Sequence, residues 1–266
     1  MFKQRLLTTL ILIPLVLLAI YWAPFLSFAL LTALIMLLCG AEFLNLIPLK
    51  FLWLKVIYLA ALISLTVVMS HVYFHLWVMA GLVLWVLIFL ALLSYPRSQA
   101  LWGWSGIVAF SGLVLLPLFA ESLLRVYAFN KDLLVYILLL VWATDIGAYL
   151  FGKQWGRHKL IPLVSPGKTW EGFSGGVLLS MLVAVLGYFY FAPKGTFSWF
   201  AVALLTILGS MVGDLFISML KRRSKLKDTG QLLPGHGGLL DRLDSLMAAL
   251  PLFYCGYAFF NRGLLG

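Results

Sequence analysis

The sequence predicts an all-α, polytopic integral membrane protein with about nine transmembrane helices and a cytoplasmic N-terminus. Of its 266 residues, 64% are hydrophobic and only 11% are charged. Apolar runs of about 18 residues or more recur along the chain, and each can cross a hydrocarbon core about 30 Å thick. The runs lack the strict alternation of apolar and polar residues that is typical of a membrane β-strand. Their backbone hydrogen bonds must therefore form within helices rather than in a barrel.

The apolar runs place the nine predicted spans. They lie at residues 6–22, 25–46, 53–70, 74–94, 105–124, 132–152, 174–192, 197–220 and 243–261. The first follows a short basic segment, as in a signal peptide. We expect it to be retained as a helix, because it lacks a convincing small-residue cleavage site and another span follows almost at once.

The distribution of basic residues predicts the orientation. With the N-terminus in the cytoplasm, only Arg125, Lys131, Lys194 and Arg262 fall outside, against fifteen basic residues inside. Such a bias is typical of cytoplasmic loops. The residues that give the net charge of +10 therefore lie mostly at one membrane surface, where they can bind phosphate groups and anionic lipids. For this reason we expect no nucleic-acid partner.

The two halves of the chain differ in their polar residues. Residues 1–130 hold little but spans and short connections, so we interpret them as a scaffold. Residues 131–266 are predicted to form the catalytic half, with two cytoplasmic basic loops at 153–173 and 221–242.

Two aspartates stand inside predicted spans of the second half. Asp145 lies in VWATDIGAYLFG and Asp214 in GSMVGDLFISMLK, each toward the cytoplasmic end of its helix. A carboxylate at this depth costs several kcal/mol unless it is paired, hydrated or metal-bound, so each is a functional hypothesis. The alternative is an ion pair with a lysine or arginine from a basic loop.

The stretch from Ser218 to Asp244 is the most polar part of the chain. Its glycines at 230, 235, 237 and 238, with Pro234, exclude one continuous helix, so the middle must be a loop with backbone N–H groups available to a ligand. Asp241 and Asp244 close the stretch and share one face if a helix begins there.

We expect Asp145, Asp214, Asp241 and Asp244 to meet at one depth on the cytoplasmic side. Four carboxylates without clustered Cys or His describe an all-oxygen site, which suits Mg²⁺ rather than zinc. Mg²⁺ usually binds through one or two carboxylates together with substrate phosphates.

The loop after the sixth span contains Ser-Pro-Gly-Lys-Thr at residues 165–169. It resembles part of a phosphate-binding loop, but a Walker A motif needs a further glycine where Leu163 stands, and a preceding strand, which we do not expect. A P-loop ATPase is therefore excluded. The neighbouring basic residues can also be interpreted as a loop solvated at an anionic leaflet.

These groups suit phosphoryl or nucleotidyl transfer. Lysines and arginines can neutralise charge on a leaving pyrophosphate while loop N–H groups hold the phosphates in line. A phosphate nucleophile is already ionised at pH 7, so no general base is required. His236 could donate to a phosphate or shape the turn.

The polar stretch resembles the signature of the phosphatidate cytidylyltransferase family. The matching positions are Ser218, Lys221-Arg222, Lys227-Asp228, Gly230, Leu233-Pro234, His236-Gly237-Gly238, Asp241-Arg242 and Asp244, with Asp145, Ala148-Tyr149, Gly152, Gly156 and residues 165–172 upstream. The resemblance implies that CTP and phosphatidic acid give CDP-diacylglycerol and pyrophosphate. It also implies Mg²⁺, a homodimer and, for a bacterial source, the inner membrane, while the distribution of basic residues predicts that the active site faces the cytoplasm.

The resemblance assigns roles to individual positions. The implied metal ligands are Asp214, Asp241 and Asp244. It also implies that Lys221, Arg222 and Lys227 grip phosphates and that Ser218 faces a substrate. In all, we expect the catalytic residues to be Lys221, Arg222, Lys227, Asp228, His236 and Arg242, and the substrate-binding residues to be Ser165, Lys168, Thr169, Glu171, Ser218, Gly237, Gly238 and Asp145.

Three other classes remain as alternatives. Another Mg²⁺-dependent CDP-lipid phosphotransferase would use aspartates four residues apart, whereas Asp241 and Asp244 are three apart. An ion-coupled transporter would employ Asp145 and Asp214 but would leave the glycine-rich basic loop without a role. A lipid-binding scaffold would need the cations but not four converging acids.

Overall fold

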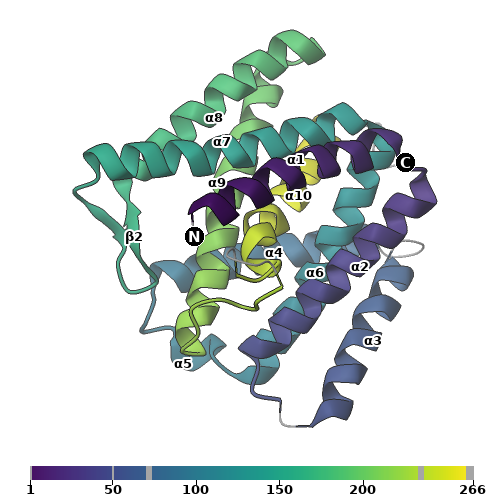
Figure 1. Cartoon of the computed structure of the whole chain (residues 1–266), viewed down its shortest axis with the longest axis vertical. Helices are drawn as coiled ribbons and strands as arrows, with labels where there is room; N and C mark the ends of the chain where they lie inside the picture. The colour runs from purple at the N-terminus through teal and green to yellow at the C-terminus, as the bar shows by residue number, and fades with distance from the viewer. Residues whose placement is uncertain (1, 50, 70–73, 233–236, 262–266) are drawn as a thin grey trace. The chain divides into compact units, whose positions relative to one another are not determined.

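A computed structural model describes residues 2–49, 51–69, 74–232 and 237–261. Figure 1 shows a chain made mostly of helices, with one small hairpin and a longer loop between α9 and α10. The elements are α1 (Phe2–Trp22), α2 (Phe25–Phe43), the 3-10 helix η1 (Leu44–Leu46), α3 (Leu52–Val68), α4 (Phe74–Leu93), α5 (Gln99–Trp102), α6 (Ser105–Phe129), α7 (Lys131–Trp155), β1 (Lys159–Ile161), β2 (Ser165–Thr169), α8 (Trp170–Phe191), α9 (Thr196–Arg223) and α10 (Leu240–Asn261).

The helices confirm an all-α polytopic membrane protein. Within the described residues, seven helical segments are long and apolar enough to cross a membrane. Two shorter apolar segments, Ile11–Trp22 and Leu52–Val68, stand where the first and third spans were predicted. The count of nine spans stays a prediction.

The chain divides into two compact units that interleave along the sequence. Unit 1 comprises Met1–Gly81, Leu101–Val135 and Leu220–Leu243, and unit 2 comprises Leu82–Ala100, Tyr136–Met219 and Asp244–Gly266. The basic loop after α9 therefore belongs to the same unit as the N-terminal helices.

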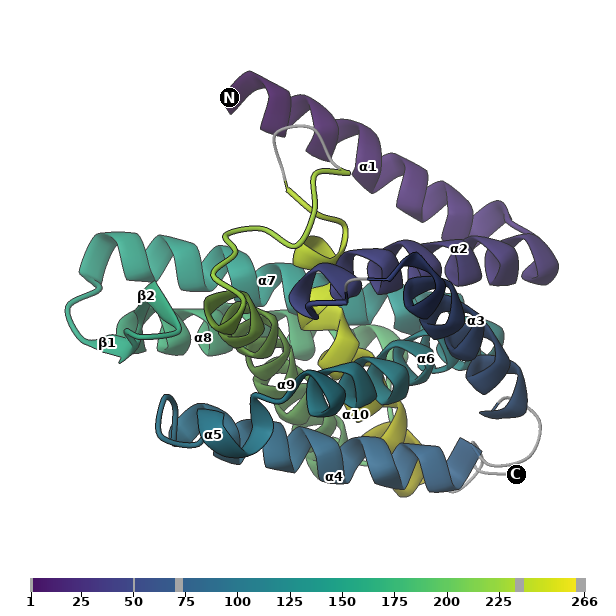
Figure 2. The same ribbon diagram turned by 90° about the horizontal axis from the view of Figure 1, so that it is seen from below.

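In unit 1, α2 and α3 pack against α6 (Figures 1 and 2). Small residues allow this close approach: a Cβ placed on Gly112 would lie 2.2 Å from the Tyr58 hydroxyl. Tyr58 in turn donates a hydrogen bond to the carbonyl of Ala109 at 3.2 Å.

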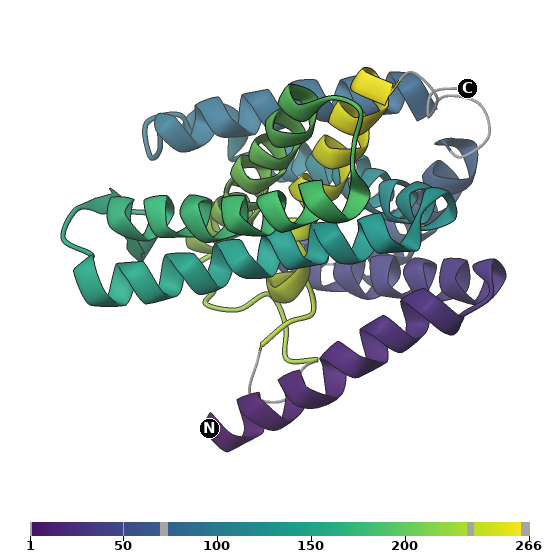
Figure 3. The same cartoon turned by 90° about the horizontal axis from the view of Figure 1, so that it is seen from above.

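In unit 2, α7 and α8 lie side by side and are joined by the β1–β2 hairpin (Figure 3). A Cβ on Gly147 of α7 would lie 2.4 Å from the Gly175 carbonyl oxygen of α8, so the two backbones nearly touch. The buried hydroxyls of Thr144 and Ser180 are 2.7 Å apart across the same interface. Small residues and polar contacts of this kind associate helices in membranes.

The hairpin shows that our expectation of no strand in the first basic loop was wrong. β1 and β2 pair antiparallel, with Lys159 opposite Thr169 and Ile161 opposite Ser165. The three residues between the strands turn the chain, and Val164 is fully buried there. The Ser-Pro-Gly-Lys-Thr segment is thus strand β2 itself rather than a loop, which places alternate side chains on opposite faces.

Candidate active site

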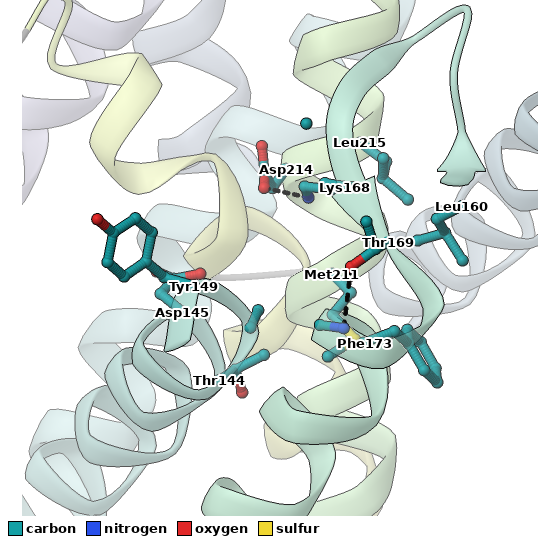
Figure 4. A pocket seen from close by; sticks show the side chains of 13 residues that line it. Thr144, Asp145, Tyr149, Leu160, Lys168, Thr169, Phe173, Met211, Asp214 and Leu215 are labelled. Atoms are coloured by element: carbon teal, nitrogen blue, oxygen red, sulfur yellow. Dashed lines mark hydrogen bonds and ion pairs between the residues drawn. The ribbon is translucent and has the colours of Figure 1, made fainter. Parts of the chain in front are cut away.

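Unit 2 contains a cavity of about 250 Å³ that brings several predicted site residues together (Figure 4). We call it the Lys168 cavity. Residues from α7, the hairpin, α8 and α9 line it: Thr144, Asp145, Ala148, Tyr149, Leu160, Gly167, Lys168, Thr169, Gly172, Phe173, Met211, Asp214 and Leu215. Asp145 and Asp214 therefore line one cavity, and the predicted meeting of both with Asp241 and Asp244 stays a prediction.

An ion pair between Lys168 of β2 and Asp214 of α9 lies in the cavity wall (Figure 4). The Lys168 ammonium donates to Asp214 Oδ2, and Ser218 Oγ lies 3.4 Å from Asp214 Oδ1. Both charged side chains are about 30% exposed, so a ligand can reach them. The ion-pair interpretation of Asp214 is thus correct, and it is compatible with a binding role because the pair lines the cavity.

Two predicted substrate-binding residues also fix the hairpin to α8. The buried Thr169 caps α8, since its Oγ1 accepts a hydrogen bond from Gly172 N at 3.1 Å. The Glu171 carboxylate accepts from His158 N at 3.2 Å and lies 2.6 Å from His158 Nδ1. These contacts keep β2, and with it Lys168, in place beside the cavity; the predicted substrate contacts of both residues remain predictions.

In unit 1, a second group of contacts centres on Asp241 in the first turn of α10. We call Lys221, Thr229, Gly238 and Asp241 the Asp241 cluster. Lys221 Nζ donates to Oδ1 at 2.7 Å. Oδ2 accepts from Thr229 N at 2.8 Å, Thr229 Oγ1 at 3.0 Å and Gly238 N at 3.1 Å. One carboxylate at a helix N-terminus, where negative charge is favoured, therefore ties together the end of α9, the loop and α10.

Backbone geometry explains two loop positions. Helix α9 ends in a Schellman motif, in which Leu226 N donates to Lys221 O and Lys225, with φ of 55°, donates to Arg222 O. Gly237 has φ of 86°, a region that other residues rarely adopt. A Cβ on Gly237 would also lie 3.3 Å from Asp228 Oδ1 and 3.4 Å from an Asp241 oxygen. Because Gly237 has no side chain, the carboxylates of Asp228 and Asp241 can both approach the backbone at this position.

Asp244, the third predicted metal ligand, is buried where α10 meets α9 within unit 2. Its Oδ1 accepts a hydrogen bond from Ser245 N at 2.8 Å. A Cβ on Gly213 would lie 2.3 Å from the Asp244 carbonyl oxygen, so the helices are in backbone contact one residue before Asp214.

The remaining predicted residues are distributed as follows. Arg222, Lys227, Asp228 and Arg242 are exposed, Ser165 is half-buried in β2, and His236 lies outside the described residues. In the described part of the chain, no three Asp, Glu, His or Cys side chains gather closely enough to hold a metal ion. The three predicted metal ligands, Asp214 and Asp244 in unit 2 and Asp241 in unit 1, each carry carboxylate oxygens, the ligand type that Mg²⁺ prefers.

Sequence reasoning missed three residues that hold the basic loop. Arg223 donates to Gly103 O at 2.6 Å, Leu46 O at 3.0 Å and Ser105 Oγ at 3.2 Å. Asn45 Nδ2 donates to Thr229 O at 2.8 Å, and Glu42 accepts from Leu240 N at 2.7 Å. A signal was present, because Glu42 is a carboxylate within a predicted apolar span.

Comparison with known proteins identifies the family. The sequence profile of the cytidylyltransferase family matches residues 3–260. A phosphatidate cytidylyltransferase of Pseudomonas aeruginosa is 38% identical over 95% of this chain and 96% of its own length. One from Haemophilus influenzae is 40% identical over 66% of each chain, and one from Staphylococcus aureus is 50% identical over 45% of this chain and 46% of its own. The chain therefore belongs to the cytidylyltransferase family, which confirms the resemblance found in its polar stretch.

Proposed function

We propose that this protein transfers the cytidylyl group of CTP to phosphatidic acid. A phosphate oxygen of the lipid attacks the α-phosphorus of CTP, the bond from that phosphorus to the bridging β-phosphate oxygen breaks, and CDP-diacylglycerol and pyrophosphate result. The observation that carries the proposal is the reachable Lys168–Asp214 pair in the wall of the Lys168 cavity. The lysine of this pair can bind a phosphate group of the substrate, and the aspartate can bind a cation. Membership of the cytidylyltransferase family is the second support.

The residues of the site act mainly by position and charge. Lys168 can leave Asp214 to bind a phosphate oxygen, because its ammonium is a flexible point charge. The exposed Arg222 and Lys227 extend the positive charge next to the Asp241 cluster. A cation of this kind can neutralise charge that develops on the departing pyrophosphate, and the lipid phosphate needs no base because it is already ionised.

Magnesium is part of the proposal, with Asp214, Asp241 and Asp244 as the residues that would hold it. When bound, Mg²⁺ supplies charge neutralisation at the triphosphate. Asp214 presents one carboxylate beside Ser218 at the cavity. Lys221 donates a hydrogen bond to Oδ1 of Asp241, whereas Oδ2 accepts hydrogen bonds from three donors. A ligand role for Asp241 therefore requires Lys221 to turn toward the substrate.

We also propose nine membrane crossings in a bacterial inner membrane, a cytoplasmic N-terminus and an active site on the cytoplasmic side. The support is the positive charge of the loops that carry the predicted site residues. The lipid would enter laterally between helices, keeping its tails in the bilayer. A homodimer is the proposed assembly.

The test is a direct product assay on the purified protein. With CTP, phosphatidic acid and Mg²⁺ we expect CDP-diacylglycerol, and we expect no product after EDTA treatment. Asp241→Ala and Asp244→Asn should abolish turnover in protein that remains folded. Lys194→Met, an exposed lysine outside the predicted site, is the matched surface control and should keep full turnover.

Two outcomes would contradict the proposal. Undiminished turnover in both aspartate variants would remove the metal assignment. Ion uptake into vesicles without any consumption of CTP would contradict the enzyme hypothesis and support a transporter that uses Asp145 and Asp214.

A further inference from the structure

Glu42, near the end of α2, is a buried acid that none of the predicted roles employs. Its side chain lies inside unit 1, and the residue is only 4% exposed. Oε1 has no hydrogen-bond partner among the described residues. Burying a carboxylate in this way is costly, so its retention needs a compensating role.

The other carboxylate oxygen holds the start of α10. Glu42 Oε2 accepts a hydrogen bond from Leu240 N at 2.7 Å. Leu240 is the first residue of α10, and its N–H is among the donors that have no partner within the helix. Glu42 therefore caps α10 from a distant part of the sequence.

The same oxygen reaches the Asp241 cluster through one hydroxyl. Thr229 Oγ1 lies 3.4 Å from Glu42 Oε2 and 3.0 Å from Asp241 Oδ2. Thr229 has a single hydroxyl proton, so the two carboxylates share one donor. A shift of Glu42 would thus disturb both the first residue of α10 and a donor to Asp241.

Two loop glycines leave room for this carboxylate. A Cβ on Gly230 would lie 2.2 Å from Glu42 Oε1, and a Cβ on Gly238 would lie 2.6 Å from Oε2. Neither distance is sterically allowed. Packing against Glu42 therefore accounts for glycine at position 230, and packing against Glu42, the Thr229 hydroxyl and the backbone of Gly230 accounts for glycine at position 238.

We propose that Glu42 is a positioning residue for cytidylyl transfer. It acts as a hydrogen-bond acceptor that fixes α10 and Thr229, so that Asp241 and Lys221 keep the geometry of the Asp241 cluster. Glu42 touches no substrate in this account. The proposal rests on the proposed function, and it gives a helix of the predicted scaffold a direct part in arranging the site.

The experiment compares three Glu42 variants. Glu42→Gln keeps an oxygen acceptor of the same reach, Glu42→Asp keeps the charge but is one methylene shorter, and Glu42→Ala removes both. Because a displacement of about 1 Å can cost about 100-fold in rate, we expect kcat to fall by about 10- to 100-fold in Glu42→Ala and Glu42→Asp. Glu42→Gln should stay within about threefold of wild type, and KM for phosphatidic acid should change little in all three.

Gly230→Ala tests the same contact without altering Glu42. The new methyl group should displace the carboxylate and lower kcat as Glu42→Ala does. The matched controls are Gly106→Ala, whose Cβ would meet nothing within 4 Å, and Glu121→Gln, a buried glutamate that pairs with Arg125. Both controls should keep wild-type kcat.

Hydrogen–deuterium exchange adds a readout that does not depend on activity. We expect the Leu240 and Thr229 amides to exchange faster in Glu42→Ala and Gly230→Ala than in wild type, and to stay protected in Glu42→Gln. Specific activity is expressed per folded protein, so that a loss of folded material cannot imitate a loss of kcat. If Glu42→Ala does not fold, Gly230→Ala and Glu42→Asp carry the test.

The inference is overturned if Glu42→Ala, Glu42→Asp and Gly230→Ala keep the wild-type kcat per folded protein. It is also overturned if Glu42→Asp has a higher kcat than Glu42→Gln. The second result would show that charge, not the acceptor, is what matters. A wild-type protein that forms no CDP-diacylglycerol would instead refute the proposed function, and the exchange measurement would still report on the Glu42 contacts.

Discussion

Replacing Lys221 by Met should destabilise unit 1 strongly, because it leaves a buried carboxylate without its cation. The Lys221 side chain is 12% exposed and that of Asp241 only 5% exposed. Met preserves the length of the side chain and its apolar packing while removing the ammonium that donates to Asp241 Oδ1 at 2.7 Å.

The magnitude follows from the contacts that remain. Removing one partner of a buried ion pair typically costs about 3–5 kcal/mol. Asp241 would still accept three hydrogen bonds from Thr229 and Gly238, so we expect a loss near the lower end, about 3 kcal/mol. The double variant Lys221→Met/Asp241→Asn removes both charges and should recover much of that loss.

Equilibrium unfolding in mixed detergent micelles measures these free energies. Lys227→Met is the matched control for stability, since Lys227 is an exposed lysine of the same loop and its loss should change the unfolding free energy by less than about 0.5 kcal/mol. If Lys221→Met were as stable as Lys227→Met, or if the double variant were less stable than both single variants, the ion pair would not support the loop as argued.

Three further substitutions test other contacts. Thr169→Val removes the cap of α8 and should cost about 1 kcal/mol in unfolding free energy, whereas Thr169→Ser should cost far less; equal losses would contradict the capping role. Arg223→Lys cannot reproduce three directed hydrogen bonds and should lower the unfolding free energy by about 1–2 kcal/mol, and an unchanged value would show that the arginine does not anchor the loop. Gly237→Ala meets a φ of 86° and should cost about 1–2 kcal/mol in the same measurement, with a fall in CDP-diacylglycerol formation; full stability and turnover would refute the need for glycine.

The sequence was sufficient for the membrane fold and for part of the site. Long apolar runs predicted the helices because a helix forms all its backbone hydrogen bonds within one segment, as a chain in lipid must. The cost of placing a carboxylate within an apolar span drew attention to Asp145 and Asp214, and both line one cavity, but their functional roles stay predictions. The signature stretch identified the family because its fixed residues are many.

Other features depend on tertiary contacts that no local pattern displays. The β1–β2 hairpin was missed, since β1 has only three residues and the five residues of β2 include proline and glycine, which have low strand propensity. Glu42 contacts Leu240, which lies 198 positions away in the sequence. The apolar residues around Glu42 give no indication of such a distant polar partner. Arg223 stood among the basic residues of the loop, and nothing in its spacing separated an anchoring arginine from one that is exposed.

The most direct test of the central claim follows the phosphorus atoms of CTP. The purified protein is given phosphatidic acid and Mg²⁺ with CTP labelled either at the α-phosphate or at the γ-phosphate. Cytidylyl transfer predicts that the α label enters the lipid fraction as CDP-diacylglycerol, while the γ label is released as pyrophosphate. Transfer of the γ label to lipid, or release of both labels without a labelled lipid, would contradict the account.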